Sequence, residues 1–575
     1  MSLTSTAGYH MKRDLKKLGS DLYDLVVVGG GITGACIARD AALRGLSAAV
    51  LEKDDFGGAT SAASGKMIHG GLRYLQYGDL KRARESLHER MVFRKIAPQF
   101  VHPVPFLVPT EKSLMKSKGM LHLGMRFYEL LGIGKNSAGG EPIPGHRVIS
   151  GKGVGDLLPG MVPEGITGGI LYYDCQMHNP ERLTLSILMA AVGAGAVAAN
   201  YVRASGLVYA GSRVAGVEAE DVLTGEQFEV RGRTVVNAAG PWVRGLTRSM
   251  GESDPFDALR FSKGIHIVTR QVTGNLALAI SSRHRHADAI LQRGGRHLFI
   301  VPWRGHSLVG TTNVAFEGKP DDKMVSEDDI TGLIDDVNDA YPGAGLRRGD
   351  VVYFYGGLYP DDTGKPSRNG YQGDRRDQVF DHEKIDGTRG LVSAVTVKYT
   401  TARKSAQTIV DLVCGKLGRG GKKCTTDKAP VYGGGIGRFE DYVASEIRNR
   451  RPPLCKETIV ALVNDYGKAY RDLVDYNLDD PHWHERLHPD RPVIKAQVVY
   501  AVHEEMARTL ADVVFRRTGL GTVGDPGDSC LRDIAAIMAD ELGWGKTRIE
   551  SEVAEAKDVF IPGATAKMES LCQTT

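Results

Sequence analysis

The sequence lacks the long apolar runs and paired cysteines that mark membrane and secreted proteins. Its longest apolar run, Ile187–Ala199, is too short to span a bilayer and contains two glycines, so it predicts a helix end, a turn and a strand start. The N-terminus has no apolar segment followed by a cleavage site, and we expect no secretory signal. The seven cysteines are scattered and form no C-x-x-C pair. We therefore expect a reducing, cytoplasmic environment and no bound metal.

Net charge is also nearly absent. The chain has 73 lysines and arginines against 69 aspartates and glutamates, which gives a formal charge of +4. This balance provides no extended positive field, so we expect no nucleic-acid partner. Glycine, by contrast, is abundant. The 71 glycines in 575 residues predict tight turns and places where the backbone approaches a ligand closely.

Regular patterns begin near Asp21, after a polar and basic segment that predicts a solvated tail or a membrane-surface contact. The apolar run Leu25–Val28 predicts a parallel strand buried on both faces. A helical stretch, ACIARDAALRG, follows three glycines and is closed by Gly45. Ser47–Lys53 predicts a second strand, which ends at Glu52.

Later segments differ in character along the chain. Helical and irregular segments are expected between about residues 75 and 180, and alternating runs such as GIHIV and HLFIV predict an antiparallel sheet within 255–355. Long helical patterns beyond residue 430, among them VVYAVHEEMARTLADVVFRR, predict a C-terminal helical domain after a linker or mobile loop at Gly415–Lys423. Four strands of a β-meander are expected at Val197–Val202, Val214–Glu220, Phe228–Arg231 and Thr234–Asn237.

The glycine turn has the spacing of a dinucleotide-binding motif. Gly29, Gly31 and Gly34 form the pattern G-x-G-x-x-G between a predicted strand and helix, and Glu52 follows about twenty residues later. The first glycine permits the turn, the second admits a pyrophosphate, and the third allows close packing of helix and strand. Free N–H groups at the helix start suit the phosphates, and the glutamate suits a ribose. The alternative is a glycine-rich turn without a ligand.

Two features favour FAD over NAD as the dinucleotide. The predicted meander interrupts the β-α alternation that an NAD domain usually continues, and it ends in VVNAAGPW, Val235–Trp242. That strand end resembles the second fingerprint of FAD domains of the D-amino-acid-oxidase and glutathione-reductase type. The loop FGGATSAASGK is rich in hydroxyl groups, which could bind a long diphosphate–ribityl chain.

The predicted fold is α/β, with a Rossmann-like FAD-binding domain, an antiparallel-sheet substrate domain and a C-terminal all-helical domain. The FAD-binding domain is expected to be discontinuous within 21–425, over about 21–75, 160–250 and 350–415. The substrate domain is expected at about 76–159 and 251–349, and the helical domain at 430–560.

Several motifs occur together in a known order: GGGITGA, ATSAASGKMIHGGLRYL, VNAAGPWV, KGIHIV, LVGTTN and KYTTARK. In this order they resemble the FAD-dependent glycerol-3-phosphate dehydrogenases, and the resemblance covers about residues 21–555. The segment HGGLRY is far more specific than the glycine pattern.

The resemblance implies that flavin and substrate meet at Lys66–Tyr74, KMIHGGLRY. Arg73 would bind substrate oxygen or phosphate with its planar fork, and Tyr74 would lie beside it. The alternative is that these two side chains only brace the loop. The cofactor-binding residues expected from the fingerprints and the resemblance are Gly29, Gly31, Ile32, Thr33, Gly34, Glu52, Lys53, Thr60, Ser61, Ser64, Lys66, His69, Gly70, Gly71, Leu72, Val202, Ala239, Gly240, Trp242, Lys398, Thr400 and Thr401.

The implied reaction is oxidation of a secondary alcohol by hydride transfer to flavin N5, while a base takes the hydroxyl proton. His266 is the first candidate base, although a core histidine is an equal interpretation, and His69 is the second. KYTTAR predicts a helix start, with Thr400 as N-cap. By the resemblance this start faces the flavin pyrimidine, where Lys398 and the helix dipole would favour an anionic reduced flavin.

The sequence departs from the family at two places. An arginine in a G-[VIL]-R-P segment is replaced by Tyr359, which we retain as a catalytic and substrate-binding candidate, and Thr396-Val397 replaces a glycine pair. Loss of one charge-assisted phosphate contact costs about 1.5–3 kcal/mol. Arg376 matches a second phosphate-contacting arginine, and Arg375 could substitute for it.

These features leave several interpretations open. The first is a dehydrogenase of a polyol phosphate that passes electrons to a quinone or another acceptor, with peripheral membrane contact and a homodimer as expected partners. The second, favoured by Tyr359, is an oxidase or dehydrogenase of a different alcohol or sugar phosphate. A regulatory flavin-binding protein would not need Arg73, His266 and Lys398, and HGGLRY speaks against an amine oxidase.

Overall fold

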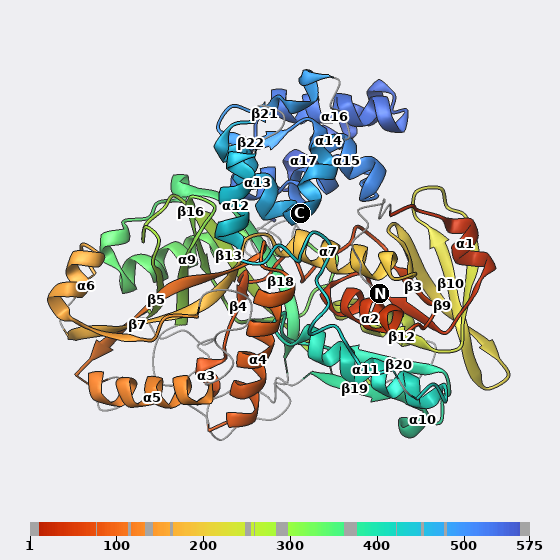
Figure 1. Ribbon diagram of the computed structural model, residues 1–575, viewed down its shortest axis with the longest axis horizontal. Helices are drawn as coiled ribbons and strands as arrows, with labels where there is room; N and C mark the ends of the chain where they lie inside the picture. The colour runs from red at the N-terminus through yellow and green to blue at the C-terminus, as the bar shows by residue number, and fades with distance from the viewer. Residues whose placement is uncertain are drawn as a thin grey trace, which may run out of the picture.

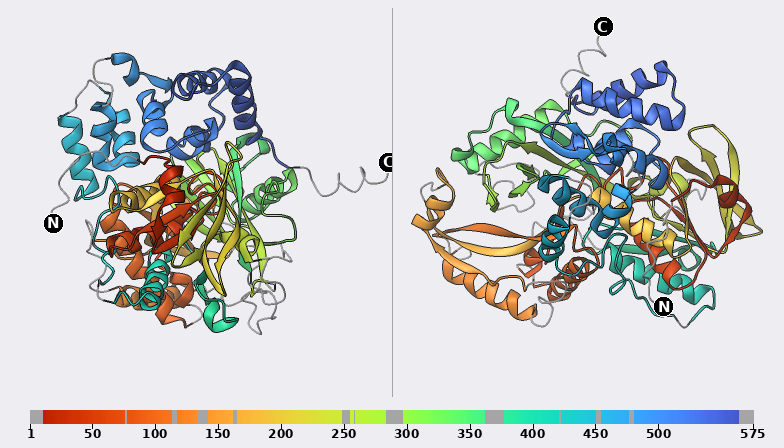
Figure 2. Two further views of the ribbon diagram at one scale, coloured as in Figure 1. Left: turned by 90° about the vertical axis from the view of Figure 1, so that its right-hand side faces the viewer. Right: turned by 45° about the horizontal axis from the view of Figure 1, so that its top comes forward.

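The computed structural model describes residues 11–75, 78–112, 117–132, 142–161, 165–247, 255–257, 259–282, 297–361, 377–420, 422–449, 454–475 and 480–563. Figure 1 shows a parallel sheet with its helices on the right, a large second sheet on the left, and the C-terminal helices above both. In the left panel of Figure 2, turned by 90°, the C-terminal helices again lie above the two sheets. The α/β class and the helical C-terminal region are confirmed.

The parallel sheet has the strand order β19-β20-β12-β2-β3-β8, and β19 alone is antiparallel to its neighbour among these described strands. The predicted strand Leu25–Val28 is confirmed as β2. Its side chains alternate between two cores, with Leu25 and Val27 facing the helices and Val26 and Val28 facing the opposite side. The strands are β2 Leu25–Val28, β3 Ala48–Leu51, β8 Val197–Ala199, β12 Val235–Asn237, β19 Gln378–Asp381 and β20 Leu391–Val395.

Helices cover one face of this sheet and a small sheet covers the other. The helical face carries α2 Ile32–Leu43, α7 Pro180–Gly193 and α11 Ala402–Lys416. The small sheet has the order β1-β11-β10-β9. Its strands are β1 Leu22–Tyr23, β9 Val202–Ala210, β10 Arg213–Asp221 and β11 Gln227–Gly232. Helix α1 (Leu15–Ser20) buries Leu18 against the same core, so this part of the N-terminal segment is not a solvated tail.

The meander prediction is partly wrong. Val197–Val202 is not one strand, because β8 ends at Ala199 and Tyr201 has a positive φ of 54° that turns the chain into the small sheet. The predicted strand Thr234–Asn237 is formed as β12, but it pairs with β2 and β20 in the parallel sheet instead of with the meander.

In the described part of the chain, the second sheet has ten strands in the order β17-β13-β16-β15-β14-β5-β7-β4, with β18 beside β13 and β6 beside β7. Within this sheet only β14 and β5 pair in parallel among the described strands, so the predicted antiparallel sheet is confirmed as mainly antiparallel. Its strands are β4 Met67–Ile68, β5 Val101–Glu111, β6 Arg147–Ser150, β7 Ile166–Met177, β13 Arg260–Thr269, β14 Ala277–Ser281, β15 His297–Trp303, β16 His306–Gly310, β17 Val314–Phe316 and β18 Val351–Asp361.

The two long strands β5 and β7 contradict the expectation of helical and irregular segments in this region. Strand β5 contains three prolines, at positions 103, 105 and 109, which suppress the strand signal in the sequence. All three prolines lie at alternate positions of the strand, so the missing N–H donors all face the same edge. Pairing with β7 continues along its whole length.

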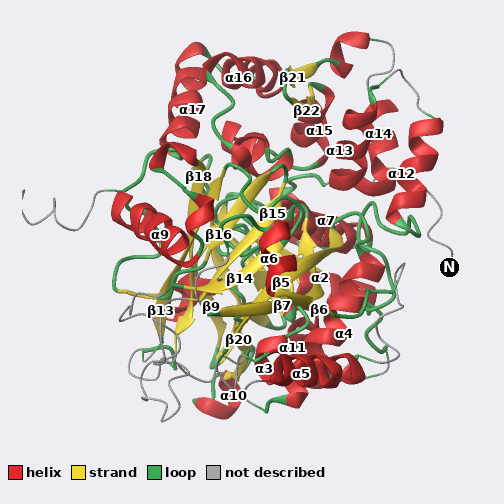
Figure 3. Ribbon diagram, turned by 90° about the vertical axis from the view of Figure 1, so that its left-hand side faces the viewer, coloured by secondary structure: helices red, strands yellow, loops and turns green. Residues whose placement is uncertain are grey.

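Helices lie on both faces of this sheet, with α9 on one face and α4 and α5 on the other (Figure 3). The remaining helices before residue 420 are α3 Leu72–Leu75, α4 Leu80–Ile96, α5 Lys118–Leu131, α6 Gly151–Leu157, α8 Val243–Thr247, α9 Glu327–Ala340 and α10 His382–Ile385. Helix α11 extends to Lys416, so the expected linker begins later than the sequence indicated.

The C-terminal region contains helices and one short hairpin. Its elements are α12 Phe439–Arg448, α13 Lys456–Tyr466, α14 Tyr470–Asp475, β21 Arg486–His488, β22 Arg491–Ile494, α15 Ala496–Glu504, α16 Asp528–Leu542 and α17 Lys546–Asp558. The long helix expected over VVYAVHEEMARTLADVVFRR is broken: α15 ends at Glu504, Met506 has a positive φ of 57°, and a π-helix spans Asp512–Arg517. Among the described residues no helix has both the length and the apolar character needed to cross a membrane.

Helix α2 begins in direct contact with the end of β2. A Cβ atom at Gly34 would lie 1.9 Å from the carbonyl oxygen of Gly29. We expect Gly34→Ala to lower the free energy of unfolding by about 1–3 kcal/mol, because the backbone must move to relieve this overlap. Thermal or denaturant unfolding measures the change.

Gly332→Ala is the matched control. Gly332 lies inside α9, and a Cβ atom there would have nothing within 4 Å. Alanine should therefore stabilise by about 0.5–1 kcal/mol, the usual gain inside a helix. Equal effects at the two glycines would contradict the close contact at Gly34.

Candidate functional site

A cavity of about 2350 Å³ lies between the parallel sheet and the large sheet. Ordinary ligand pockets measure about 300–1,000 Å³, so this space can hold a dinucleotide and a substrate together. Most of the predicted site residues line it: Gly29, Gly31, Ile32, Thr33, Glu52, Lys53, Thr60, Ser61, Ser64, His69, Gly71, Leu72, Tyr74, Val202, Ala239, Gly240, Trp242, His266, Tyr359, Lys398 and Thr400. Gly34, Lys66, Gly70 and Thr401 are not among the lining residues.

The glycine turn forms one wall of the cavity. Gly29 has a φ of 105°, and a Cβ atom there would lie 2.6 Å from the carbonyl oxygen of Ala238. Gly31 is the N-cap of α2, so N–H groups of the first helical turn point toward the cavity. The hydroxyl of Ser61 accepts a hydrogen bond from the N–H of Ile32 at 2.9 Å. This is the cradle that a pyrophosphate requires.

Glu52 joins the second strand to the turn. Its carboxylate accepts a hydrogen bond of 2.7 Å from the N–H of Gly30 and one of 3.0 Å from the N–H of Asp54. Burial raises the pKa of Glu52 to about 7. Lys53 lies 4.2 Å above the ring of Trp242 and pairs with Asp321 at 2.7 Å, so the two ends of this wall are tied together.

The HGG segment is enclosed between β7 and α4. The N–H of Gly70 donates to Asp174 of β7 at 2.8 Å, and Asp174 also pairs with Arg90 of α4 at 3.0 Å. A Cβ atom at Gly70 would lie 1.8 Å from the hydroxyl oxygen of Tyr128. Gly71 lines the cavity and has a φ of 78°. Packing therefore requires the first glycine, and backbone geometry requires the second.

The start of the α11 segment meets the HGG segment. The ammonium of Lys398 lies 4.0 Å from the centre of the Tyr74 ring. The hydroxyl of Thr400 accepts a hydrogen bond from the N–H of His69 at 3.2 Å. Burial lowers the pKa of Lys398 to about 8. Two segments more than 300 residues apart thus meet at the cavity wall.

Thr400 is not the N-cap of this helix. Helix α11 begins at Ala402, its N-cap is Thr401, and no side chain caps the helix start. The hydroxyl of Thr401 instead donates to Asp377 at 3.1 Å, and Asp377 also accepts from the N–H of Val397 at 2.9 Å. The hydroxyl of Thr400 instead bonds to the N–H of His69, and Thr400 lines the cavity.

Three histidines line the cavity, His69, His266 and His297, and the first two are the candidate bases. His266 of β13 stacks on Tyr355, with ring centres 5.2 Å apart, and its Nδ1 has no hydrogen-bond partner among the described residues. A Cβ atom at Gly310 would lie 2.3 Å from Cδ2 of His266, so the ring needs a glycine opposite it. Burial and the charge of Lys66 lower the pKa of His266 to about 3. Burial lowers the pKa of His69 to about 4, so both rings are neutral at pH 7.

The remaining predicted residues have different surroundings. The hydroxyl of Tyr359 donates to the amide oxygen of Asn313. Lys66 is buried, pairs with Glu181 at 3.1 Å and lies 4.6 Å above the ring of Trp303, and burial lowers its pKa. Arg73 belongs to α3, but its side chain is outside the described part of the structure, as are Arg375 and Arg376.

The sequence interpretation missed three polar residues of this site. Asp174 is an acidic residue within the apolar stretch LYYDC of β7, a signal that could have marked it as buried for a purpose. Asn313 ends the motif LVGTTN, but the motif alone does not indicate a role for this side chain. Asp377 gives no local signal, because its partners are about 20 to 30 residues away.

The donor set fits FAD. The cavity combines the N-terminus of α2, the acid Glu52, and the hydroxyls of Thr60, Ser61 and Ser64 on one wall with Lys398 on another. These are the groups needed for a pyrophosphate, a ribose, a ribityl chain and an anionic ring.

Comparisons with known proteins support this assignment. A family profile described as "FAD dependent oxidoreductase" matches residues 24–394, and a profile described as "C-terminal domain of alpha-glycerophosphate oxidase" matches 424–549. A glycerol-3-phosphate dehydrogenase of Synechocystis sp. is 34% identical over 554 residues, which cover 94% of this chain and 97% of the relative. Glycerol-3-phosphate dehydrogenase 2 of Mycobacterium tuberculosis is 30% identical over 553 residues, covering 94% and 88%.

A solved structure has the same fold over nearly the whole chain. The glycerol-3-phosphate dehydrogenase of Bacillus halodurans, complexed with FAD, superposes with a TM-score of 0.75 at 25% sequence identity, covering 96% of this chain and 98% of that one. Profile, relatives and structure agree: the chain belongs to the FAD-dependent glycerol-3-phosphate dehydrogenase family.

Proposed function

We propose that this protein oxidises the secondary alcohol of glycerol 3-phosphate, or of a related polyol phosphate, to the ketone. The observation that carries the proposal is that His69, His266 and Lys398 line the same cavity as the dinucleotide turn. A base, a cation and a cofactor site in one cavity are the requirements of this oxidation. The names of the relatives support the substrate.

Bound FAD would supply a hydride acceptor, and the side chains of the chain orient the alcohol and take its proton. His266 is the proposed base, because its unpartnered Nδ1 and neutral ring can accept a proton. A phosphate dianion held in the cavity would raise the low pKa of this histidine, since a nearby negative charge favours the imidazolium. His69 is the alternative base. Arg73 and Tyr74, with Arg375 or Arg376, remain the proposed phosphate contacts.

Lys398 is expected to set the upper pH limit of activity. Its pKa of about 8 means that the ammonium is present below that pH and is lost as the pH rises through it. We expect kcat/KM to fall above about pH 8, because kcat/KM reports the pKa values of the free enzyme. Lys398→Arg should abolish this fall, since arginine stays charged. Lys398→Met should lower kcat/KM about a hundredfold below pH 8, and by progressively less above it, where the parent also loses this charge. A Lys398→Met variant with the full rate and an unchanged pH profile would contradict this role.

A different alcohol is the second candidate substrate, and Tyr359 favours it. Its phenol carries no positive charge where the family has an arginine, and its hydroxyl is already bound to Asn313. We expect glycerol 3-phosphate to bleach the flavin under anaerobic conditions, and Tyr359→Arg to tighten its apparent Kd about tenfold to a hundredfold by adding one charge-assisted contact.

Tyr359→Phe is the control, because it removes only the hydroxyl and should leave the apparent Kd within about twofold. If glycerol 3-phosphate fails to bleach the flavin of the unmodified protein while another alcohol bleaches it, the second candidate is correct. Equal affinity in the arginine variant and the parent means that Tyr359 has no part in specificity.

The electron acceptor is proposed to be a membrane quinone, reached from a lipid surface at α5. One face of this helix carries Met120, Leu123, Phe127 and Leu130, and the two leucines are 65% and 60% exposed. Met120 and Leu121 also line the cavity, so the helix borders a route into it. Exposed Arg126 on the same helix suits an anionic leaflet. Figures 1 and 3 show α5 on the side away from the C-terminal helices. The proposed location is the cytoplasmic face of a membrane.

Replacing Leu123 and Phe127 together by glutamate should abolish binding to vesicles that contain anionic lipid. Burial of two large apolar side chains is worth about 3–6 kcal/mol, which is more than a hundredfold in partitioning. Turnover with a soluble dye as acceptor should be unchanged. Ile385→Glu on α10, also an exposed apolar residue, is the control and should keep vesicle binding. If the double variant instead converts a dimer into a monomer in solution, α5 is covered by a second copy of the chain.

A further inference from the structure

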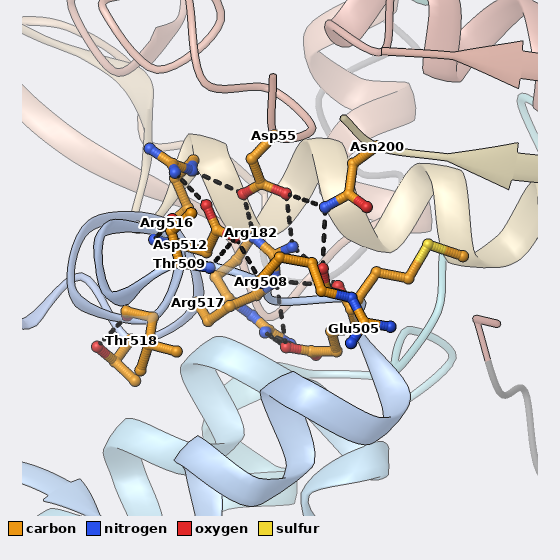
Figure 4. Close-up of polar contacts among 12 residues, drawn as sticks. Asp55, Arg182, Asn200, Glu505, Arg508, Thr509, Asp512, Arg516, Arg517 and Thr518 are labelled. Carbon is orange, nitrogen blue, oxygen red and sulfur yellow. Dashed lines mark hydrogen bonds and ion pairs between the residues drawn. The ribbon is translucent and has the colours of Figure 1, made fainter. Parts of the chain in front are cut away.

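Two arginines of the C-terminal domain reach the segment that follows β3. Figure 4 shows the guanidinium groups of Arg516 and Arg517 directed at Asp55. Arg517 binds this carboxylate with both terminal nitrogens, at 2.7 and 2.8 Å, and Nε of Arg516 donates to it at 2.6 Å. The side-chain amide of Asn200 adds a hydrogen bond of 3.0 Å. All hydrogen-bonding directions of the carboxylate oxygens are thereby used.

Asp55 depends on these arginines. Its side chain is fully buried. Burial by itself would raise the pKa of Asp55, but the charges of Arg517 and Arg516 lower it well below its usual range. A buried carboxylate without such partners must either take up a proton or move to solvent. The position of this residue is therefore fixed by the C-terminal domain.

Asp55 lies in the middle of a segment, Glu52–Ser61, that contacts the glycine turn on its other side. Glu52 accepts a hydrogen bond from the N–H of Gly30, and the N–H of Gly57 donates to the carbonyl of Gly30 at 3.1 Å. Ser61 accepts from the first N–H of α2. A displacement of Asp55 thus displaces the wall of the dinucleotide cavity.

The C-terminal domain itself contributes none of the described residues that line the cavity, since the last of them is Thr400. Any influence of this domain on the cofactor must pass through contacts such as Asp55. We propose that Arg517, assisted by Arg516, is a positioning residue for FAD, and that the C-terminal domain holds Glu52–Ser61 in its binding geometry. By linkage, bound FAD stabilises the attachment of Arg516 and Arg517 to the same degree.

Arg304 supplies the matched control. Its guanidinium donates to the carbonyl oxygens of Gly519 at 3.1 Å and Thr518 at 3.3 Å, so it ties the residues directly after Arg517 to the turn between β15 and β16. No hydrogen bond recorded for Arg304 reaches Glu52–Ser61. Loss of Arg517 or of Arg304 weakens the attachment of the C-terminal domain, but only loss of Arg517 releases the segment Glu52–Ser61.

The test is the Kd of FAD, measured by flavin fluorescence on reconstituted apoprotein at a temperature where circular dichroism shows each variant folded. We expect Arg517→Met to weaken FAD binding about tenfold or more. Arg517→Lys should weaken it less, because lysine keeps the charge but not the two-nitrogen contact with the carboxylate. The Kd of Arg304→Met should stay within about twofold of the parent's. Arg517→Met with the Kd of the parent would overturn the proposal, as would an equal loss in Arg304→Met.

A second measurement needs no variant and applies even if Arg517→Met does not fold. Hydrogen exchange of the full chain is compared with and without FAD. We expect the amides of Asp512–Arg517 to exchange more slowly when FAD is bound, although this π-helix does not line the cavity. Unchanged exchange there, with slowed exchange in the glycine turn as proof of binding, would contradict the coupling.

Discussion

The contact between the start of α2 and the end of β2 is the constraint on which the site depends. Gly34 leaves no room for a side chain beside the carbonyl of Gly29, so helix and strand approach as closely as two backbones can. This approach directs the first N–H groups of the helix toward the cavity and brings Glu52 of the next strand to the N–H of Gly30. The phosphate and ribose positions are consequently set by one local packing contact.

The substrate side of the cavity contains titratable side chains whose charged forms are disfavoured by burial. The pKa values of His266 and Lys398 are both lowered for this reason. Lys398 rests on the ring of Tyr74, and His266 rests on Tyr355. Both side chains pack against aromatic rings, and this packing does not take up their hydrogen bonds. Lys398 and His266 can therefore still bond to a ligand. Asp174, Asp377 and Asp55 do the opposite: each is committed to several donors and holds backbone segments in place. The structure thus separates residues that position the cavity wall from residues that can react.

Local patterns in the sequence predicted those strands, turns and helices whose formation depends on residues close together in the chain. The four apolar residues of β2, the glycine turn and α2 follow from spacing alone, and the motif order identified the family. The break at Tyr201 was missed because VAANYV reads as one apolar run, and the break at Met506 was missed because helical spacing continues across it. Strands β5 and β7 were missed because prolines conceal a pairing that is formed across about 60 residues. The pairs Lys66–Glu181 and Asp55–Arg517 join residues 115 and 462 positions apart, and no local pattern predicts them.

The central claim is that one cavity brings the flavin ring together with His266, Lys398 and the HGG segment. The most direct measurement is an experimental structure of the flavin-loaded protein. The account predicts a pyrophosphate over Gly29–Gly31 and an isoalloxazine ring that contacts both Gly71 and Lys398. A flavin bound elsewhere, or a ring turned away from Lys398 with His266 on the far side of the protein wall, would contradict it.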